Sequence, residues 1–165
     1  MSAAHRYLVA LGANVRHPRH GLPRWVLAAA MEALAARFAL VAPSPIVDSA
    51  PLGPSHRRYA NAVVMVEADL APEDMLAALH AIEREFGRKR RGQRWGARVL
   101  DLDLVLWSGG AWATPGLTIP HPAFRERAFV LAPAAAIAPG WRDPLTGLPL
   151  ARLHRRLTRP RRLHR

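Results

Sequence analysis

The sequence predicts an α+β fold with a ferredoxin-like βαββαβ core, and three observations support this prediction. Two amphipathic helical segments alternate with four segments of strand character. Their order, strand–helix–strand–strand–helix–strand, is that of a split βαβ arrangement. The 165 residues, half of them hydrophobic, suit one domain with a sizeable core. We therefore expect a single domain over 1–165, with a mostly antiparallel sheet covered by helices, additions after Trp107 and a basic tail at 152–165.

The first half of the chain supplies a strand, a helix and an irregular strand. Residues 5–11 are predicted to form a strand, and Gly12 is expected to end it. Residues 24–38 form a helix in this prediction, because apolar side chains recur at the spacing of one helical face. Prolines within 40–49 make that extended segment an edge or irregular strand. The apolar face of the helix consists of Leu27, Met31, Leu34 and Phe38.

The second half begins with a strong strand at 59–70, followed by a helix that starts at Pro72 and ends at Gly87. A basic loop over 87–97 leads into the next strand, and a third helix is expected at 124–136. The remainder is rich in turns. A short leucine stripe precedes the tail and consists of Leu148, Leu150, Leu153 and Leu157.

The strand at 98–107 contains the most informative pattern, Asp101-Leu102-Asp103. Side chains alternate on a strand, so both aspartates point away from the face of the even-numbered leucines, which are Leu100, Leu102, Leu104 and Leu106. Two neighbouring carboxylates on an apolar strand repel each other and lose hydration. A hard divalent cation would relieve this repulsion, and Mg²⁺ is commonly held by one or two carboxylates plus phosphate oxygens. A solvated surface pair is the alternative interpretation.

The basic loop before this strand has the composition of a phosphate-binding lid. Guanidinium groups bind phosphate through two hydrogen bonds, and an aromatic side chain can cover a base or a reacting centre. A solvated basic loop is the plainer interpretation of any single arginine. The side chains concerned are Arg88, Lys89, Arg90, Arg91, Arg94, Trp95 and Arg98.

Six further positions are candidates for binding. His80 and Glu83 share one face of the second helix, opposite its buried stripe. His121 lies between two prolines that restrict its backbone, so it could donate to a phosphate. Asn61, in an apolar strand, could pair with the edge of a heterocycle. Tyr59 and Phe129 are ordinary core candidates that could also stack on a planar ligand.

The composition limits the cellular setting and the partners. The net charge is +12, from 24 basic and 12 acidic residues, which indicates affinity for anions. The chain has no cysteine, which excludes disulfides and thiolate metal sites. No apolar stretch is long enough to span a membrane. We expect a cytoplasmic, soluble and monomeric protein that binds small molecules, with no membrane contact and no specific nucleic acid.

Several separate motifs occur in the order found in a known family. The chain resembles the 6-hydroxymethyl-7,8-dihydropterin pyrophosphokinases of folate biosynthesis from Leu8 to about Pro139. The most specific stretch runs Arg-Trp-Gly-Ala-Arg-Val-Leu-Asp-Leu-Asp over 94–103, with Ala97 where the family signature has proline. Supporting stretches lie at 11–14, 51–61, 82–88 and 119–131.

The resemblance implies a reaction and a set of site residues. Such enzymes transfer the β,γ-pyrophosphoryl group of ATP to a pterin hydroxymethyl group and leave AMP. Asp101 and Asp103 would hold two Mg²⁺ ions and, with Arg88 and Arg98, would be catalytic. The expected ATP contacts are His80, Glu83, Arg88, Trp95, Arg98, Leu104, Thr118, His121 and Arg127. The expected pterin contacts are Ser49, Ala50, Leu52, Tyr59, Asn61, Trp95 and Phe129.

Two other functions stay open at the level of the sequence. The first is a nucleic-acid-binding module anchored by the arginine tail, although its strands offer few of the exposed aromatics typical of such modules. The second is a diverged homologue that acts on another hydroxymethyl heterocycle. The enzyme interpretation leaves the arginine tail unexplained.

Overall fold

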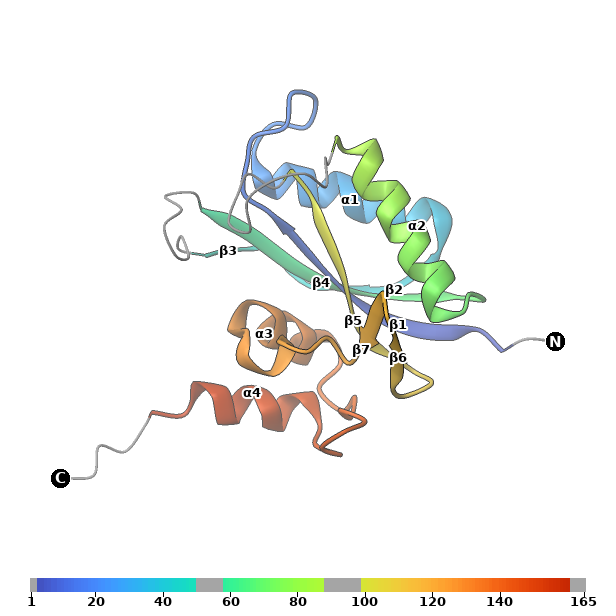
Figure 1. Ribbon diagram of the computed structural model, residues 1–165. Helices are drawn as coiled ribbons and strands as arrows, with labels where there is room; N and C mark the ends of the chain where they lie inside the picture. The colour runs from blue at the N-terminus through green and yellow to red at the C-terminus, as the bar shows by residue number, and fades with distance from the viewer. Residues whose placement is uncertain (1–2, 50–57, 88–98, 161–165) are drawn as a thin grey trace.

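The computed structural model describes residues 3–49, 58–87 and 99–160. A five-stranded sheet lies at its centre, in the order β2 (Ala39–Pro43), β4 (Tyr59–Ala68), β1 (His5–Ala13) and β5 (Asp101–Trp107). The short β3 (Val47–Ser49) pairs with β4, and every pairing is antiparallel. This order confirms the predicted ferredoxin-like core (Figure 1).

Two helices cover one face of the sheet, namely α1 (Pro23–Arg37) and α2 (Pro72–Glu85). Each begins with a proline in its first turn, where the missing N–H costs no hydrogen bond. Gly87 follows α2 with a φ of 86°, a conformation that favours glycine. Between the helices and the sheet lies an apolar core to which Leu27, Leu34, Leu79 and Ile82 contribute fully buried side chains.

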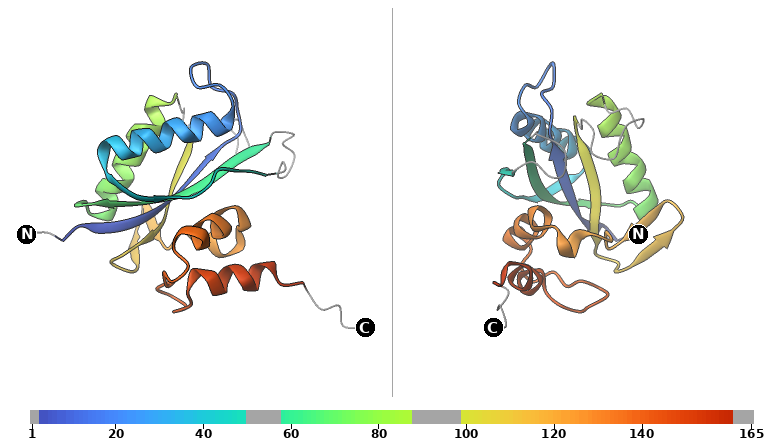
Figure 2. Two further views of the ribbon diagram at one scale, coloured as in Figure 1. Left: turned by 180° about the vertical axis from the view of Figure 1, so that it is seen from behind. Right: turned by 60° about the vertical axis from the view of Figure 1, so that its left-hand side comes forward.

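Of the segments after β5, α3 and α4 cover the opposite face (Figure 2). A hairpin of β6 (Trp112–Thr114) and β7 (Leu117–Ile119) leads to a 3-10 turn, Phe124–Glu126, and then to α3 (Ala128–Ile137). α3 lies against the sheet, and α4 (Leu150–Thr158) packs on α3 as an outer layer (Figure 1). The sheet therefore has helices on both faces, with α1 and α2 on one face and α3 and α4 on the other.

Four boundaries differ from the predictions. β1 continues through Gly12 to Ala13, because Gly12 pairs with neighbours on both sides. The segment 40–49 divides into two short strands, β2 and β3. The helix expected at 124–136 is a 3-10 turn followed by α3. The tail expected from Arg152 begins as helix, since α4 extends to Thr158.

A bulge interrupts β5 and changes which face its side chains occupy. Val9 pairs with Leu104, whereas the preceding Leu8 pairs with Leu106, so Val105 is the extra residue. Leu104 lies in the core under α1 and α2, while Val105 and Leu106 both lie in the core under α3. The prediction that Leu106 shares a face with Leu100, Leu102 and Leu104 is therefore wrong.

A buried ion pair holds the connection between α3 and α4. Arg125 donates from Nε to Asp143 Oδ2 at 2.5 Å and from a terminal nitrogen to Oδ1 at 2.7 Å. The backbone N–H of Leu145 and the hydroxyl of Thr146 also donate to this carboxylate. Asp143 is fully buried, and although burial alone would raise its pKa, these hydrogen bonds lower it to about 2.

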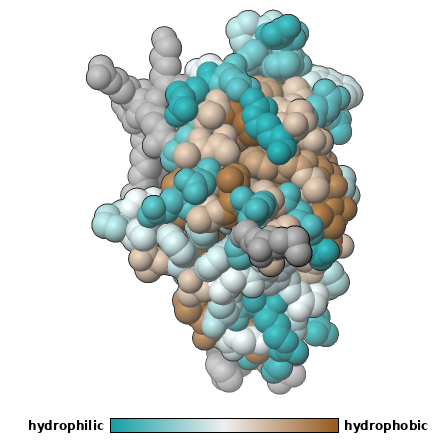
Figure 3. All heavy atoms as spheres, turned by 90° about the vertical axis from the view of Figure 1, so that its right-hand side faces the viewer, coloured by the Kyte–Doolittle hydropathy of each residue, from teal (hydrophilic) through white to brown (hydrophobic). Residues whose placement is uncertain are grey.

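The surface mixes polar and apolar side chains. On the face seen in Figure 3, hydrophilic and hydrophobic side chains are interspersed. Among the described residues, no helix is both long and apolar enough to cross a bilayer.

Candidate active site

Two rows of paired residues cross the centre of the sheet on the face toward α3. Asn61 of β4, Gly12 of β1 and Asp101 of β5 occupy one row. Residues that pair directly across an antiparallel sheet point to the same face. Asn61 and Asp101 therefore lie on one face, separated by a residue without a side chain.

The neighbouring row repeats this pattern with Val63, Ala10 and Asp103. Both aspartates thus share a face, as the alternation predicted, and that face is the one under α3. They are partly exposed, in contrast to the buried Leu102 between them. The carboxylate pair and the amide of Asn61 are separated by one strand, β1, although about forty residues lie between them in the chain.

Gly12 and Ala10 form a low floor between Asn61 and the aspartates. A Cβ atom added at Gly12 would lie 3.4 Å from Asn61 Oδ1, which is ordinary van der Waals contact. Any larger side chain would extend over that contact. Sequence reasoning did not single out these two positions, because their significance lies in the strand register.

The Asn61 side chain is held in a defined orientation. It is 7% exposed, and its Nδ2 donates to Ser49 Oγ at 3.1 Å. Ser49 pairs with Tyr59, so these predicted pterin contacts lie together at one end of β3 and β4. The hydrogen bond leaves Oδ1 as the atom of the amide that is turned toward Gly12.

His121 is oriented by two hydrogen bonds. Its backbone N–H donates to the carbonyl of Val105 at 3.0 Å, and its Nδ1 accepts the N–H of Ala123 at 3.1 Å. In the neutral ring the proton is therefore on Nε2. Burial, followed by the charge of Arg127, lowers the pKa of His121, while Asp101 acts in the opposite direction.

Arg127 and Phe129 lie at the start of α3. The Arg127 guanidinium carbon is 5.8 Å from the centre of the Phe129 ring, within the range of a cation–π contact. Since both Asp101 and Arg127 affect the pKa of His121, the structure brings these three predicted residues into one electrostatic neighbourhood.

Glu83 has a structural role that the sequence did not reveal. It is 2% exposed, and its Oε2 accepts the backbone N–H of Leu102 at 3.1 Å. β5 is at the edge of the sheet, so its outer side has no neighbouring strand. The Glu83 carboxylate therefore accepts a backbone N–H that would otherwise lack a partner in the sheet. The prediction that Glu83 lies opposite the buried stripe of α2 is wrong, because it is buried with that stripe.

Besides Glu83, two predicted ATP contacts, Leu104 and His80, belong to the face of the sheet opposite the aspartates. The Leu104 side chain is buried in the core on the other face of the sheet. His80 is partly buried on α2, which covers that same opposite face. Thr118 is exposed on β7. Five other predicted contacts lie outside the described residues, namely Ala50, Leu52, Arg88, Trp95 and Arg98.

The donor set at the centre suits a hard cation whose remaining ligands come from elsewhere. Within residues 3–49, 58–87 and 99–160, no group of three or more His, Cys, Asp or Glu side chains could enclose a metal ion. Two carboxylates alone match Mg²⁺, which usually keeps waters and binds substrate phosphates. The site can thus take a cation together with a polyphosphate.

Comparisons with known proteins identify the family of the chain. Residues 8–139 match the family described as 7,8-dihydro-6-hydroxymethylpterin-pyrophosphokinase. A 2-amino-4-hydroxy-6-hydroxymethyldihydropteridine pyrophosphokinase of Pseudomonas aeruginosa is 44% identical over 142 residues, covering 84% of each chain. The protein of the same name from Haemophilus influenzae is 39% identical over 133 residues, covering 79% of each.

A solved structure shows the same fold at low sequence identity. The wild-type HPPK-DHPS protein of Plasmodium falciparum, solved with pteroate, superposes with a TM-score of 0.69 at 11% identity. The match covers 94% of this chain and 43% of that larger one.

Proposed function

Because the chain belongs to the 7,8-dihydro-6-hydroxymethylpterin-pyrophosphokinase family, we propose that it transfers the β,γ-pyrophosphoryl group of ATP to 6-hydroxymethyl-7,8-dihydropterin. The products are the pterin diphosphate and AMP. One observation carries the proposal, namely the row in which Asn61 and Asp101 face each other across Gly12. This row offers a polar edge for a flat ring at one end and a cation-binding carboxylate at the other.

The pterin lies over Gly12 in this proposal. Asn61 Oδ1 accepts from the amino edge of the ring, since Nδ2 already donates to Ser49. Tyr59 and Phe129 line the slot. A buried amide that is fully paired with one heterocycle discriminates strongly against rings that leave it unpaired.

Asp101 and Asp103 would hold Mg²⁺, as two ions in our proposal. The cation would supply neutralisation of phosphate charge and would make the attacking hydroxyl easier to deprotonate. The chain contributes position rather than covalent chemistry. Its aspartates share one face of a strand that packing fixes on both sides.

His121 and Arg127 bind the phosphates of ATP. With Nδ1 occupied by the N–H of Ala123, the ring presents Nε2–H as its donor. The lowered pKa keeps the ring neutral at pH 7, so His121 donates one hydrogen bond without adding a charge. Arg127 adds a permanent charge and a planar pair of donors.

The remaining contacts follow the resemblance. Arg88 and Arg98 bind phosphate, Trp95 covers the reacting centre, and Ala50 and Leu52 complete the pterin slot. We include His80, Glu83, Leu104 and Thr118 as nucleotide contacts. Because the Leu104 side chain is buried, we assign its nucleotide contact to its backbone atoms.

The decisive experiment identifies the nucleotide product. Purified protein is incubated with ATP, Mg²⁺ and 6-hydroxymethyl-7,8-dihydropterin, and the nucleotides are separated by chromatography. We expect AMP in equal amount to the pterin diphosphate, and no AMP when the pterin lacks its hydroxyl group. Formation of ADP, or of AMP without pterin, would refute the proposal, and chelation of Mg²⁺ should abolish the reaction.

A further inference from the structure

The outer helix α4 carries two opposite faces with different roles. Leu150 and Leu153 are 0% and 8% exposed and pack against α3. On the opposite side the arginines recur at i, i+3, i+4 and i+7, within an arc of about 100° at 3.6 residues per turn. They are Arg152, Arg155, Arg156 and Arg159, and all four are exposed. We call these four residues the arginine face.

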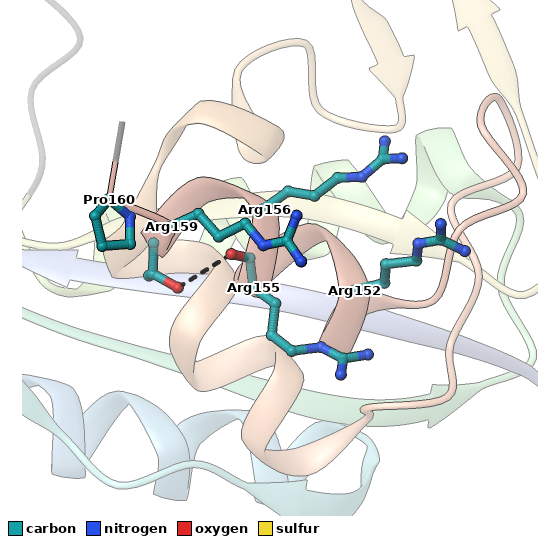
Figure 4. Close-up of a pocket in the computed structure, with 6 residues that line it drawn as sticks. Arg152, Arg155, Arg156, Arg159 and Pro160 are labelled. Atoms are coloured by element: carbon teal, nitrogen blue, oxygen red, sulfur yellow. Dashed lines mark hydrogen bonds between the residues drawn. The ribbon is translucent and has the colours of Figure 1, made fainter. Parts of the chain in front are cut away.

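The arginine face lines an open hollow of about 500 Å³ together with Thr158 and Pro160. Figure 4 shows the arginine side chains extending from the helix around this hollow, with the Thr158 hydroxyl bonded to the carbonyl of Arg155. Within the described part of the chain, no ion pair is recorded for these four side chains. Their guanidinium groups are therefore available to an external anion.

The surroundings do not neutralise this charge. Residues 127–165 contain nine arginines and a single acid, Asp143. That acid is fully buried and bonded to Arg125. α3, beneath α4, has no charged side chain. The 3-10 turn that also contacts α4 contributes one exposed acid, Glu126. The four arginines outnumber it, so the arginine face keeps a net positive potential.

We propose that the arginine face binds the phosphate backbone of a nucleic acid without regard to base sequence. Arg152 to Arg159 spans about 10 Å along the helix at 1.5 Å per residue. Successive phosphates of one strand are about 3.4 Å apart along a nucleic-acid axis, so the face matches about three of them. The face has no aromatic side chain, so it offers no stacking surface on which bases could be distinguished.

Other partners fit the arginine face less well. An amphipathic helix that binds membranes inserts its apolar side, but Leu150 and Leu153 are already buried on α3. A protein interface usually has an apolar core surrounded by polar residues. The hollow is lined by four arginines, one threonine and one proline, which supply no such core.

The test is a fluorescence-anisotropy titration of the full chain with labelled 20-nucleotide strands of two unrelated sequences, over a range of potassium chloride concentrations. In the double variant Arg155→Gln/Arg156→Gln, the slope of log K against log salt should become less steep by about 1.4, since each single-strand contact contributes about 0.7. Both sequences should bind equally. Arg155→Lys/Arg156→Lys keeps the charges and should keep the slope.

A matched control separates the arginine face from net charge. Arg19 and Arg24 are exposed. They belong to the loop before α1 and to the start of α1, which lie at the end of the molecule away from α4 (Figures 1 and 2). Arg19→Gln/Arg24→Gln removes the same charge and should leave the slope unchanged. Arg152→Gln/Arg159→Gln provides a second test of the face, with circular dichroism to verify folding.

Three results would overturn the proposal. They are an equal loss of slope in the control and the α4 variants, a strong preference for one base sequence, and binding to anionic lipid vesicles with no binding to nucleic acid. AMP formation should be unchanged in the Arg155→Gln/Arg156→Gln variant. This readout keeps the proposal separate from the pyrophosphokinase activity.

Discussion

The two faces of the central sheet differ in what their side chains do. The face under α1 and α2 is a closed apolar core that contains Leu102 and Leu104 of β5 and the preceding Leu100. The face under α3 has an apolar core at one end, around Leu8, Met65 and Leu106. Its other end presents Asn61 and the two aspartates. Before the bulge, neighbouring side chains of β5 point to opposite faces of the sheet, one that stabilises the fold and one that carries the proposed site. Substitutions one residue apart should therefore affect either stability or activity.

The largest effect is expected on the aspartate face. Asp101→Asn or Asp103→Asn should lower kcat by about 10²- to 10³-fold, because each removes a cation-binding carboxylate. The free energy of unfolding should change by about 1 kcal/mol or less. AMP formation and urea unfolding measure the two quantities. Asp69→Asn, at an exposed position, is the control, and full activity of either aspartate variant would contradict the proposed site.

The opposite result is expected on the α1 and α2 face. Leu79 is fully buried, and Leu79→Ala should lower the free energy of unfolding by about 3 kcal/mol through the lost burial and the cavity. Under folding conditions kcat should be unchanged. Leu145→Ala, at a position 67% exposed, should change stability little. A large loss of kcat in the folded Leu79→Ala protein would show that the two faces are not separate.

A smaller, pH-dependent effect is expected in the outer layer. Because the pKa of Asp143 is lowered from 3.8 to about 2, its contribution to stability is present above pH 3.8 and is lost as the pH falls toward 2. The contribution is about 2 kcal/mol. Urea unfolding between pH 5 and pH 2 measures it. The variant Asp143→Asn should lack this component of the pH dependence, and an identical pH profile in both proteins would refute the assignment.

The smallest effect is expected at the floor between Asn61 and Asp101. Gly12→Val should raise KM for the pterin about tenfold, since the added methyl groups extend into the slot. KM for ATP should be unchanged, and Gly12→Ala should have a lesser effect. Gly140→Val is the control, because a Cβ atom there would meet no other atom within 4 Å. An equal rise in both KM values would show that Gly12 does not select the pterin.

The sequence predicted the elements of the core because their signals are local. The apolar spacing of α1 and α2, the prolines at their starts and Gly87 at the end of α2 all lie within the segments they define. α4 was missed for the converse reason. An isolated nine-residue helix is marginal in water, and packing on α3 supplies its stability.

The candidate site was predicted in its residues but not in its arrangement. The shared face of Asp101 and Asp103 follows from alternation alone. The position of Asn61 opposite Gly12 depends on the pairing of β4 with β1, which no local pattern encodes. The bulge at Val105 and the burial of Glu83 against Leu102 likewise depend on neighbouring elements.

The bulge in β5 has a mechanical consequence. The carbonyl of Val105, the extra residue, accepts the backbone N–H of His121. The strand that carries both aspartates is therefore directly bonded to the segment that carries the histidine. A displacement of β5 would move His121 with it, so amide hydrogen exchange at His121 should change when a ligand occupies the aspartate pair.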